Sequence, residues 1–143
     1  MTENDKLVGT WKLVSVSSTT ETGTRNQTPY GLGPVGYLTY TADGRMSSVI
    51  SYGGREPLSF GRTGAAQMEE QAEAFKTFFA YAGRYTLSND QVIHHVEVSS
   101  IQNFVNKDQV RTIRFEGERI ALVTPPMVVN GEIQTVELIW QRL

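Results

Sequence analysis

The segments Gly9-Thr10-Trp11-Lys12-Leu13-Val14-Ser15 and Leu138-Ile139-Trp140-Gln141-Arg142 lie at opposite ends of the chain and together indicate its fold. A Gly-x-Trp entering the first strand and an arginine leaving the last one are typical of a small antiparallel barrel with one closed end. We expect Trp11 to fill the floor of this barrel, with the Arg142 guanidinium lying across the indole as a cation–π contact. A barrel closed in this way surrounds a lumen that can hold a ligand.

The composition is that of one soluble globular domain and argues against several kinds of partner. The chain has 143 residues, enough for one core, so we expect a single barrel domain over residues 1–143. A net charge of −2 argues against nucleic acid and membrane surfaces as partners. There are no cysteines, which excludes disulfides and thiol catalysis. The polar segment Met1–Lys6 has no signal-peptide character, so we expect a cytoplasmic protein.

Strand-like segments recur at short spacing and predict an eight-stranded up-and-down barrel. The predicted strands lie near residues 10–18, 35–41, 45–52, 84–88, 91–100, 109–115, 118–124 and 132–142.

A helix is predicted over residues 65–82, between the third and fourth of these strands. Apolar residues recur there at spacings of three and four, Thr63 is a suitable N-cap, and Gly83 is a suitable stop. The apolar stripe consists of Met68, Ala72, Phe75, Phe79 and Ala82.

Two turns predict how neighbouring strands pair. Thr41-Ala42-Asp43-Gly44-Arg45 fits a three-residue loop with a left-handed glycine, which pairs Tyr40 with Met46, Leu38 with Ser48 and Gly36 with Ile50. At Phe115-Glu116-Gly117-Glu118, a two-residue turn would pair Ile113 with Ile120 and set Arg111 opposite Leu122. Strand alternation also places Trp11, Leu13, Ser15 and Ser17 on one side of the first strand.

The resulting inner face is apolar with a few polar groups, which is the usual composition of a ligand pocket. Tyr30, on the long loop between residues 18 and 34, could cover its mouth. The residues that we expect to contact a ligand are Leu13, Ser15, Leu38, Tyr40, Met46, Ser48, Ile50, His94, Val96, Arg111, Ile113, Leu122 and Leu138.

His94 and His95 are the only histidines, and neighbours on a strand point to opposite faces. They cannot hold one metal ion together, so no metal site is expected. The more apolar face of the strand carries His94, which we place in the lumen, with His95 outside beside Glu97. His94 either satisfies a buried hydrogen bond or takes part in ligand binding or acid–base chemistry.

Arg111 is the second polar group of interest, because a guanidinium keeps its charge when it is buried. It either pairs with a glutamate or backbone carbonyls near the rim, or binds a carboxylate, enolate or carbonyl oxygen of a ligand.

The two terminal segments, Gly9–Ser15 and Leu138–Arg142, resemble those of the lipocalin-like domain proteins of bacteria and fungi. The resemblance also covers Gly36–Ser47, with its Asp-Gly-Arg-Met, and His94-His95-Val96. It implies a calycin-type eight-stranded barrel with a helix inserted after the third strand. Some proteins of this kind are similar to barrels associated with secondary metabolism. The chain departs from the family pattern at Gln102-Asn103-Phe104, where a proline before the asparagine and a tryptophan after it are expected.

Three functional hypotheses follow. The first is binding of a small hydrophobic metabolite in the barrel. The second is a cofactor-free cyclase, isomerase or dehydratase acting on a polyketide- or terpenoid-like intermediate, in which His94 would move a proton and Arg111 or a tyrosine would stabilise oxyanion charge. The third is an interaction role, with Val14 and Val16 outside the barrel forming a possible homodimer interface or lying under the helix. No cofactor is expected for any of them.

Overall fold

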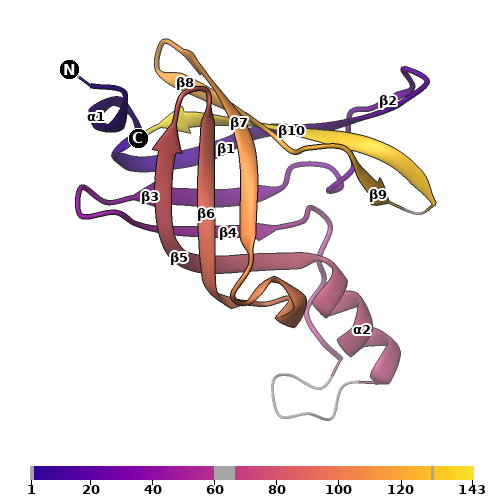
Figure 1. The fold of residues 1–143 in the computed structure, drawn as a ribbon. Helices are drawn as coiled ribbons and strands as arrows, with labels where there is room; N and C mark the ends of the chain where they lie inside the picture. The colour runs from indigo at the N-terminus through magenta and orange to yellow at the C-terminus, as the bar shows by residue number, and fades with distance from the viewer. Residues whose placement is uncertain (1, 60–66, 130) are drawn as a thin grey trace.

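One antiparallel sheet closes on itself to form a barrel (Figure 1). The computed structural model describes residues 2–59, 67–129 and 131–143. Eight strands form the barrel, and β10 pairs with β1 to close it, which confirms the predicted fold class. These strands are β1 (Gly9–Thr20), β3 (Val35–Tyr40), β4 (Arg45–Ser51), β5 (Phe78–Ser88), β6 (Gln91–Ser99), β7 (Asp108–Glu116), β8 (Arg119–Val123) and β10 (Glu132–Arg142). Two short strands, β2 (Arg25–Asn26) and β9 (Met127–Val129), extend the sheet beside β1 and β10.

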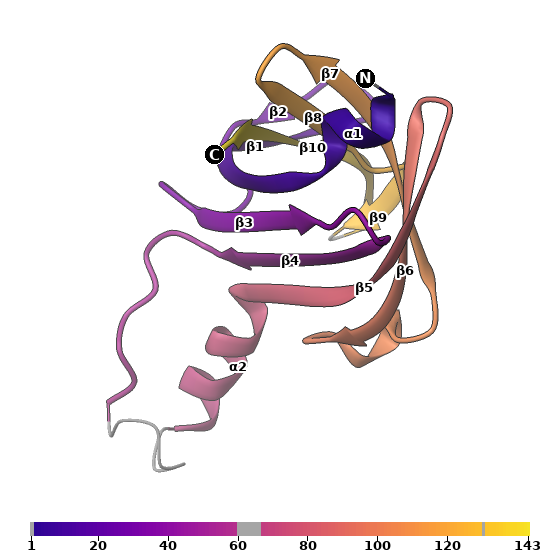
Figure 2. The same ribbon diagram turned by 90° about the vertical axis from the view of Figure 1, so that its left-hand side faces the viewer.

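Helices are few in the described residues. They are α1 (Glu3–Leu7), α2 (Met68–Lys76) and the single 3-10 turn η1 (Gln102–Phe104). Figures 1 and 2 show α2 extending away from the barrel beside the start of β5. None of these helices has the length and apolar character needed to cross a membrane.

The predicted helix over residues 65–82 is too long at its C-terminal end. Residues 78–82 belong to β5, where Phe78 pairs with Ser51 and Ala82 with Ser47. The helix therefore lies between β4 and β5 and ends at Lys76. Gly83 is a buried residue of β5 rather than a helix stop, and Thr63 lies outside the described residues.

The register predicted for β3 and β4 is confirmed, since Tyr40 pairs with Met46, Leu38 with Ser48 and Gly36 with Ile50. The register predicted for β7 and β8 is wrong by two residues, because Ile113 pairs with Leu122 and Phe115 with Ile120. The loop consists of Gly117, with a left-handed φ of 66°, and Glu118. A shift of two leaves every side chain on its expected face.

β1 departs from simple alternation at Val14. The pairing with β10 runs Leu13–Trp140, Ser15–Ile139 and Val16–Leu138, so Val14 is an extra residue in a β-bulge. Beyond the bulge the faces exchange, which exposes Ser15 and buries Val16 in the barrel. The predicted inward position of Ser15 and outward position of Val16 are therefore wrong.

The closed end has the expected contact between the two chain ends. The Arg142 guanidinium carbon lies 4.3 Å from the centre of the Trp11 ring, and its Nη1 donates to the Val8 carbonyl over 2.8 Å. The Trp11 indole donates to the carbonyl of the fully buried Leu7 in α1 over 2.9 Å. A Cβ on Gly9 would lie 2.8 Å from Arg142 Nη1, so the glycine leaves room for the guanidinium.

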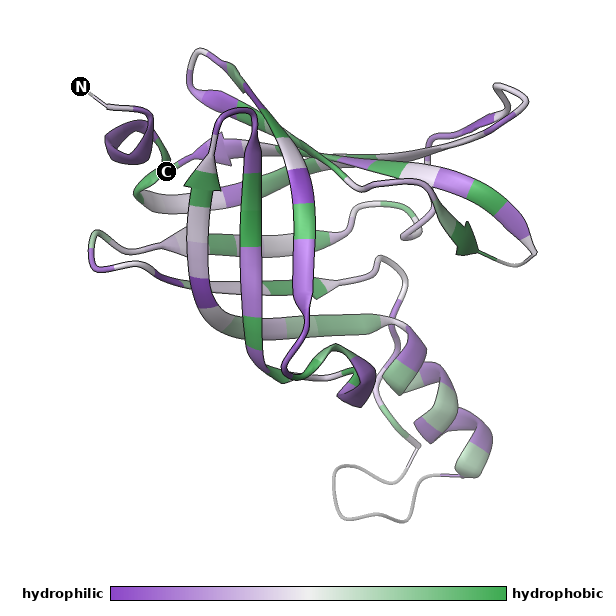
Figure 3. Cartoon of the chain, viewed as in Figure 1, coloured by the Kyte–Doolittle hydropathy of each residue, from purple (hydrophilic) through white to green (hydrophobic). Residues whose placement is uncertain are grey.

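Figure 3 shows the alternation of apolar and polar residues along the barrel strands.

Candidate ligand-binding cavity

A cavity of about 100 Å³ lies inside the barrel. This is below the roughly 300–1,000 Å³ of pockets for drug-sized ligands, so it suits a molecule of about one ring. Its lining residues are Tyr30, Leu38, Ser48, Ile50, Phe79, Tyr81, His94, Phe104, Gln109, Arg111, Leu122, Thr124, Met127, Leu138 and Trp140.

The predicted contact residues occupy three kinds of position. Seven line the cavity, namely Leu38, Ser48, Ile50, His94, Arg111, Leu122 and Leu138. Five others are buried in the core but do not line it, namely Leu13, Tyr40, Met46, Val96 and Ile113. Ser15 is exposed outside the barrel and cannot contact a ligand in the lumen.

Several lining residues are absent from the sequence-based set. Phe79 and Tyr81 were assigned to the helix, which hid their alternation along β5. Trp140 lies two residues after Leu138 in the last strand, so the alternation of that strand could have placed it in the cavity. Phe104 in η1 occupies the position where the family pattern has a tryptophan, so the departure marked a lining residue. Gln109, Thr124 and Met127 had no such signal.

His94 is held between two tyrosine hydroxyls. Its Nε2 lies 2.7 Å from the Tyr40 hydroxyl, and its Nδ1 lies 2.6 Å from the Tyr81 hydroxyl. Tyr40 comes from β3, Tyr81 from β5 and His94 from β6, so this hydrogen-bonded chain joins three strands of the barrel. The fully sequestered imidazole has a lowered pKa of about 3, caused by burial first and then by the positive charges of Arg111 and His95.

A neutral imidazole donates through one nitrogen and accepts through the other. Tyr40 is almost fully buried, and a Tyr40 hydroxyl that donates to Nε2 leaves no hydrogen without a partner. We therefore assign the His94 proton to Nδ1, which donates to the Tyr81 oxygen. Tyr81 lines the cavity, and in this arrangement its own hydroxyl hydrogen is free to be donated to a ligand. Burial also raises the pKa of both tyrosines, which keeps them neutral.

Arg111 has no carboxylate partner. Its Nη1 donates to the Val110 carbonyl over 2.9 Å, and the ion pairs of the described residues all involve other side chains. Residues 1, 60–66 and 130, which the structure does not describe, include no aspartate or glutamate. Of the two kinds of protein partner expected for Arg111, the backbone carbonyl is therefore present and the glutamate is not.

Trp140 contributes another donor. This side chain is almost fully buried and lines the cavity, and its indole nitrogen has no hydrogen-bond partner among the described residues. A buried N–H without a partner is costly, roughly 1–3 kcal/mol, so an oxygen of a ligand would be favourable there.

Tyr30 lies at the cavity and is fixed by an aromatic stack. Its ring centre is 4.3 Å from that of Tyr52, with the two planes 11° apart. Burial, together with the neighbouring Tyr52, raises the pKa of Tyr30. Tyr30 therefore lines the cavity while its ring stacks on Tyr52.

His95 points outward, as predicted, and its hydrogen-bond partners are Asp108 and Thr86. Its Nδ1 lies 2.9 Å from the Asp108 carboxylate, and Nε2 lies 2.7 Å from the Thr86 hydroxyl. Glu97 instead pairs with Arg45 and Arg84. Among the described residues, no group of three histidine, cysteine or acidic side chains has the geometry to hold a metal ion.

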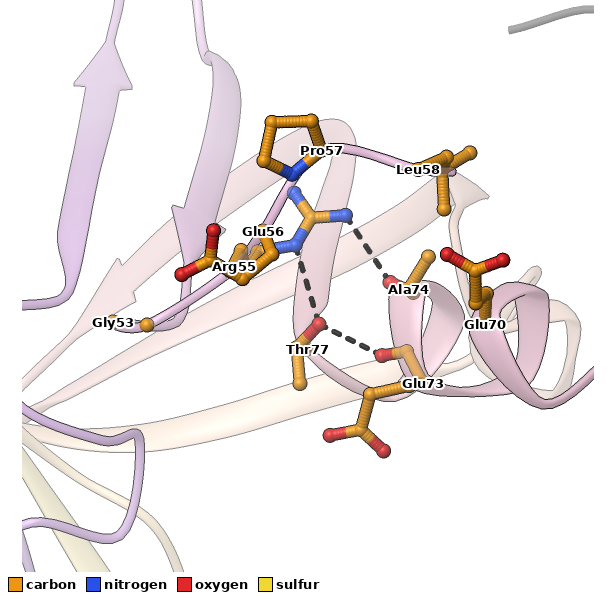
Figure 4. A pocket seen from close by; sticks show the side chains of 10 residues that line it. Gly53, Arg55, Glu56, Pro57, Leu58, Glu70, Glu73, Ala74 and Thr77 are labelled. Atoms are coloured by element: carbon orange, nitrogen blue, oxygen red, sulfur yellow. Dashed lines mark hydrogen bonds between the residues drawn. The ribbon is translucent and has the colours of Figure 1, made fainter. Parts of the chain in front are cut away.

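A larger hollow of about 320 Å³ lies outside the barrel, between residues 53–58 and α2 (Figure 4). Arg55 holds this segment against the helix end, donating to the Thr77 hydroxyl over 3.2 Å and to the Ala74 carbonyl over 3.4 Å. Its acidic wall and open shape distinguish it from the lumen. We regard it as a surface groove, because it shares no lining residue with the cavity inside the barrel.

A closed antiparallel barrel with a small, mostly apolar internal cavity defines the class of small-molecule-binding barrels. The model of the lipocalin-like domain matches residues 8–143, and the chain belongs to this family. It is 36% identical over 84 residues to the 4'-hydroxy-3'-methoxypropiophenone carrier protein of Aspergillus oryzae, covering 52% of this chain and 76% of that protein. An uncharacterized protein from Bacteroides eggerthii is 8% identical in sequence, with 96% of this chain and 99% of that chain covered at a TM-score of 0.45. That likeness is too distant to add to the description of the fold.

Proposed function

We propose that this protein binds a small hydrophobic metabolite in the barrel lumen and releases it unchanged, as a carrier. The observation that carries this proposal is a mostly apolar cavity inside the barrel, whose polar lining includes the donors Arg111, Trp140 and Tyr81. The similarity to a fungal protein named as a carrier of an aryl ketone supports a ligand with an aromatic ring and oxygen substituents. A role in secondary metabolism is part of the same proposal.

The state of His94 favours binding over catalysis. With its pKa lowered to about 3, the imidazole is neutral at physiological pH and is a weak base. The tyrosines beside it have raised pKa values and are weak acids. The catalytic roles considered for His94 and Arg111 therefore have less support than their roles as ligand contacts. The cytoplasmic location and the possible homodimer stay predictions.

Titration of intrinsic tryptophan fluorescence tests the proposal, since Trp140 lines the cavity. The probe is 4'-hydroxy-3'-methoxypropiophenone, with calorimetry as an independent measurement. We expect saturable binding that Ser48→Phe abolishes by filling the lumen. The matched control is Val49→Phe on the outward face of β4, which should bind as the unmodified protein does. Thermal unfolding confirms that both variants are folded.

Two results would count against a carrier. Unchanged binding by Ser48→Phe would move the site out of the lumen. Conversion of the probe during incubation, seen by chromatography, would instead support the cyclase, isomerase or dehydratase alternative.

A further inference from the structure

The cavity contains a cation and no anion. Its 15 lining residues include Arg111 but no aspartate or glutamate. The protein as a whole has a net charge of −2, so the positive lumen is a local feature rather than a reflection of the overall charge. An apolar cavity with an unneutralised guanidinium favours a negatively charged guest, since the low dielectric strengthens the attraction.

Arg111 has the hydrogen-bonding capacity to bind such a guest. A guanidinium has five N–H donors, and only one donation, to the Val110 carbonyl, is made within the described protein. The side chain is partly buried, and its charge acts on the pKa of His94, Tyr30, Tyr40 and Tyr81, so its influence extends through the cavity. The planar fork of N–H groups matches the two oxygens of a carboxylate.

Two further lining groups, Trp140 and Tyr81, also favour a ligand that supplies hydrogen-bond acceptors. Trp140 has a free N–H, and Tyr81 has a free hydroxyl hydrogen in the proton arrangement assigned above. A ligand that supplies acceptors would satisfy both, whereas a protonated amine would leave them unpaired and would be repelled by the charge of Arg111.

On these grounds we propose that the cavity selects its ligand as an anion, a small aromatic or aliphatic carboxylate or an ionised phenol or enol, with the negative oxygen bound by Arg111. This inference rests on the proposed function and specifies the chemical class of the ligand. It also identifies Arg111 as the residue that determines specificity, with Trp140 and Tyr81 as additional donors.

A pair of probes of nearly equal shape tests the charge preference. These are para-methoxybenzoate and para-methoxybenzamide, which differ in the charge of one terminal group. We expect the carboxylate to bind roughly tenfold or more tightly than the amide, with the ratio falling as salt is added. Binding is measured by calorimetry at neutral pH with the full chain.

Two variants of β7 assign the preference to one residue. Arg111→Met should reduce the carboxylate-to-amide ratio to about one. Arg114→Met makes the same chemical change on the outward face, where Arg114 pairs with Glu116 and Glu137, and should keep the ratio. Both variants change the net charge equally, so a general electrostatic effect would appear in both.

The possible outcomes separate this inference from the proposed function. Equal binding of the two probes, or a ratio unchanged in Arg111→Met, would overturn the anion preference while leaving the carrier function in place. If neither these probes nor the aryl ketone binds, the carrier function and the inference fail together. If the ketone binds and both benzoic derivatives do not, the inference is overturned and the carrier function stands.

Discussion

His94 shows how one residue in the barrel is fixed by hydrogen bonds at the expense of its charge. Both ring nitrogens have tyrosine partners at 2.7 and 2.6 Å, and no water-exposed position is available to a protonated ring. The alternation of β6 predicted the inward position of this residue. The pairing with Tyr40 and Tyr81 could not be predicted, because Tyr81 falls within the predicted helix and Tyr40 lies 54 positions from His94 in the chain.

The titration of His94 predicts how stability depends on pH. The pKa of the imidazole is about 3 in the folded protein, against an ordinary value of 6.5. Between these values the unfolded chain binds the additional proton, so this group destabilises the fold progressively as the pH falls from 6.5 toward 3. The slope is at most about 1.4 kcal/mol per pH unit, and above pH 6.5 the full contribution is present. Urea unfolding at pH 7, 5 and 4 measures this pH dependence of the free energy of unfolding.

Comparison with His94→Gln isolates this contribution from the carboxylates, which titrate in the same range. We expect the variant to be less stable at pH 7 by roughly 1–3 kcal/mol, since two buried hydroxyls lose their partner, but to lose less on acidification. His95→Gln removes the outward ring and should keep the acid-dependent loss, because His94 is intact. Parallel pH profiles for the unmodified protein and His94→Gln would contradict the assignment.

At the scale of elements, β5 shows where sequence patterns were ambiguous. Met68, Phe75, Phe79 and Ala82 fit a helical spacing, while Phe79 and Tyr81 also fit the two-residue period of a strand. Pairing with β4 and β6 decides in favour of the strand from Phe78 onward. Such pairing joins residues far apart in the chain, so the local pattern alone could not give the boundary.

Loops and bulges limited the prediction of the site in a similar way. Alternation correctly placed Leu38, Ile50 and Leu138 in the lumen, since each lies on a regular strand. It failed at Ser15, one residue after the bulge at Val14, because a single inserted residue exchanges the faces. A bulge has no fixed sequence pattern in an apolar strand, so this exchange appears only when the partner strand is known.

Gly83 marks a second irregularity, between Ala82 and Gly83 in the pairing of β5 with β6. A Cβ there would lie 2.0 Å from the carbonyl oxygen of His95, which is backbone and cannot turn away. We expect Gly83→Ala to lower the free energy of unfolding by at least about 2 kcal/mol, since the two strands would have to separate. Urea unfolding at neutral pH gives the measurement.

Gly23 provides a control of a different kind. Its φ is 92°, and a Cβ there would meet nothing within 4 Å, so Gly23→Ala carries only a conformational cost of about 1 kcal/mol. Equal effects of the two substitutions would mean that close strand approach at Gly83 is not required.

At the scale of the whole molecule, the barrel depends on contact between its first and last strands. β1 pairs with β3 on one side and with β10 on the other, and α1 covers the end where the chain termini meet (Figure 2). The two sequence segments that predicted the fold are therefore neighbours in space. Their meeting joins residues more than 120 positions apart, as in the pair Trp11–Arg142.

This closure predicts that two C-terminal truncations differ strongly in their effect on the stability of the barrel. A chain that ends at Leu138 lacks Trp140, which is almost fully buried, and Arg142, which lies over Trp11. Loss of a buried tryptophan alone costs about 3–5 kcal/mol, which is comparable to the whole stability of many domains, and the backbone of β1 from Trp11 to Ser15 also loses its partner. We expect this chain to aggregate or to show no cooperative thermal transition by circular dichroism.

Removal of Leu143 alone, a mostly exposed residue with one backbone hydrogen bond to Thr10, should change stability by less than about 1 kcal/mol. A monomeric, cooperatively unfolding chain ending at Leu138 would mean that the barrel does not need its last four pairs with β1 to remain closed.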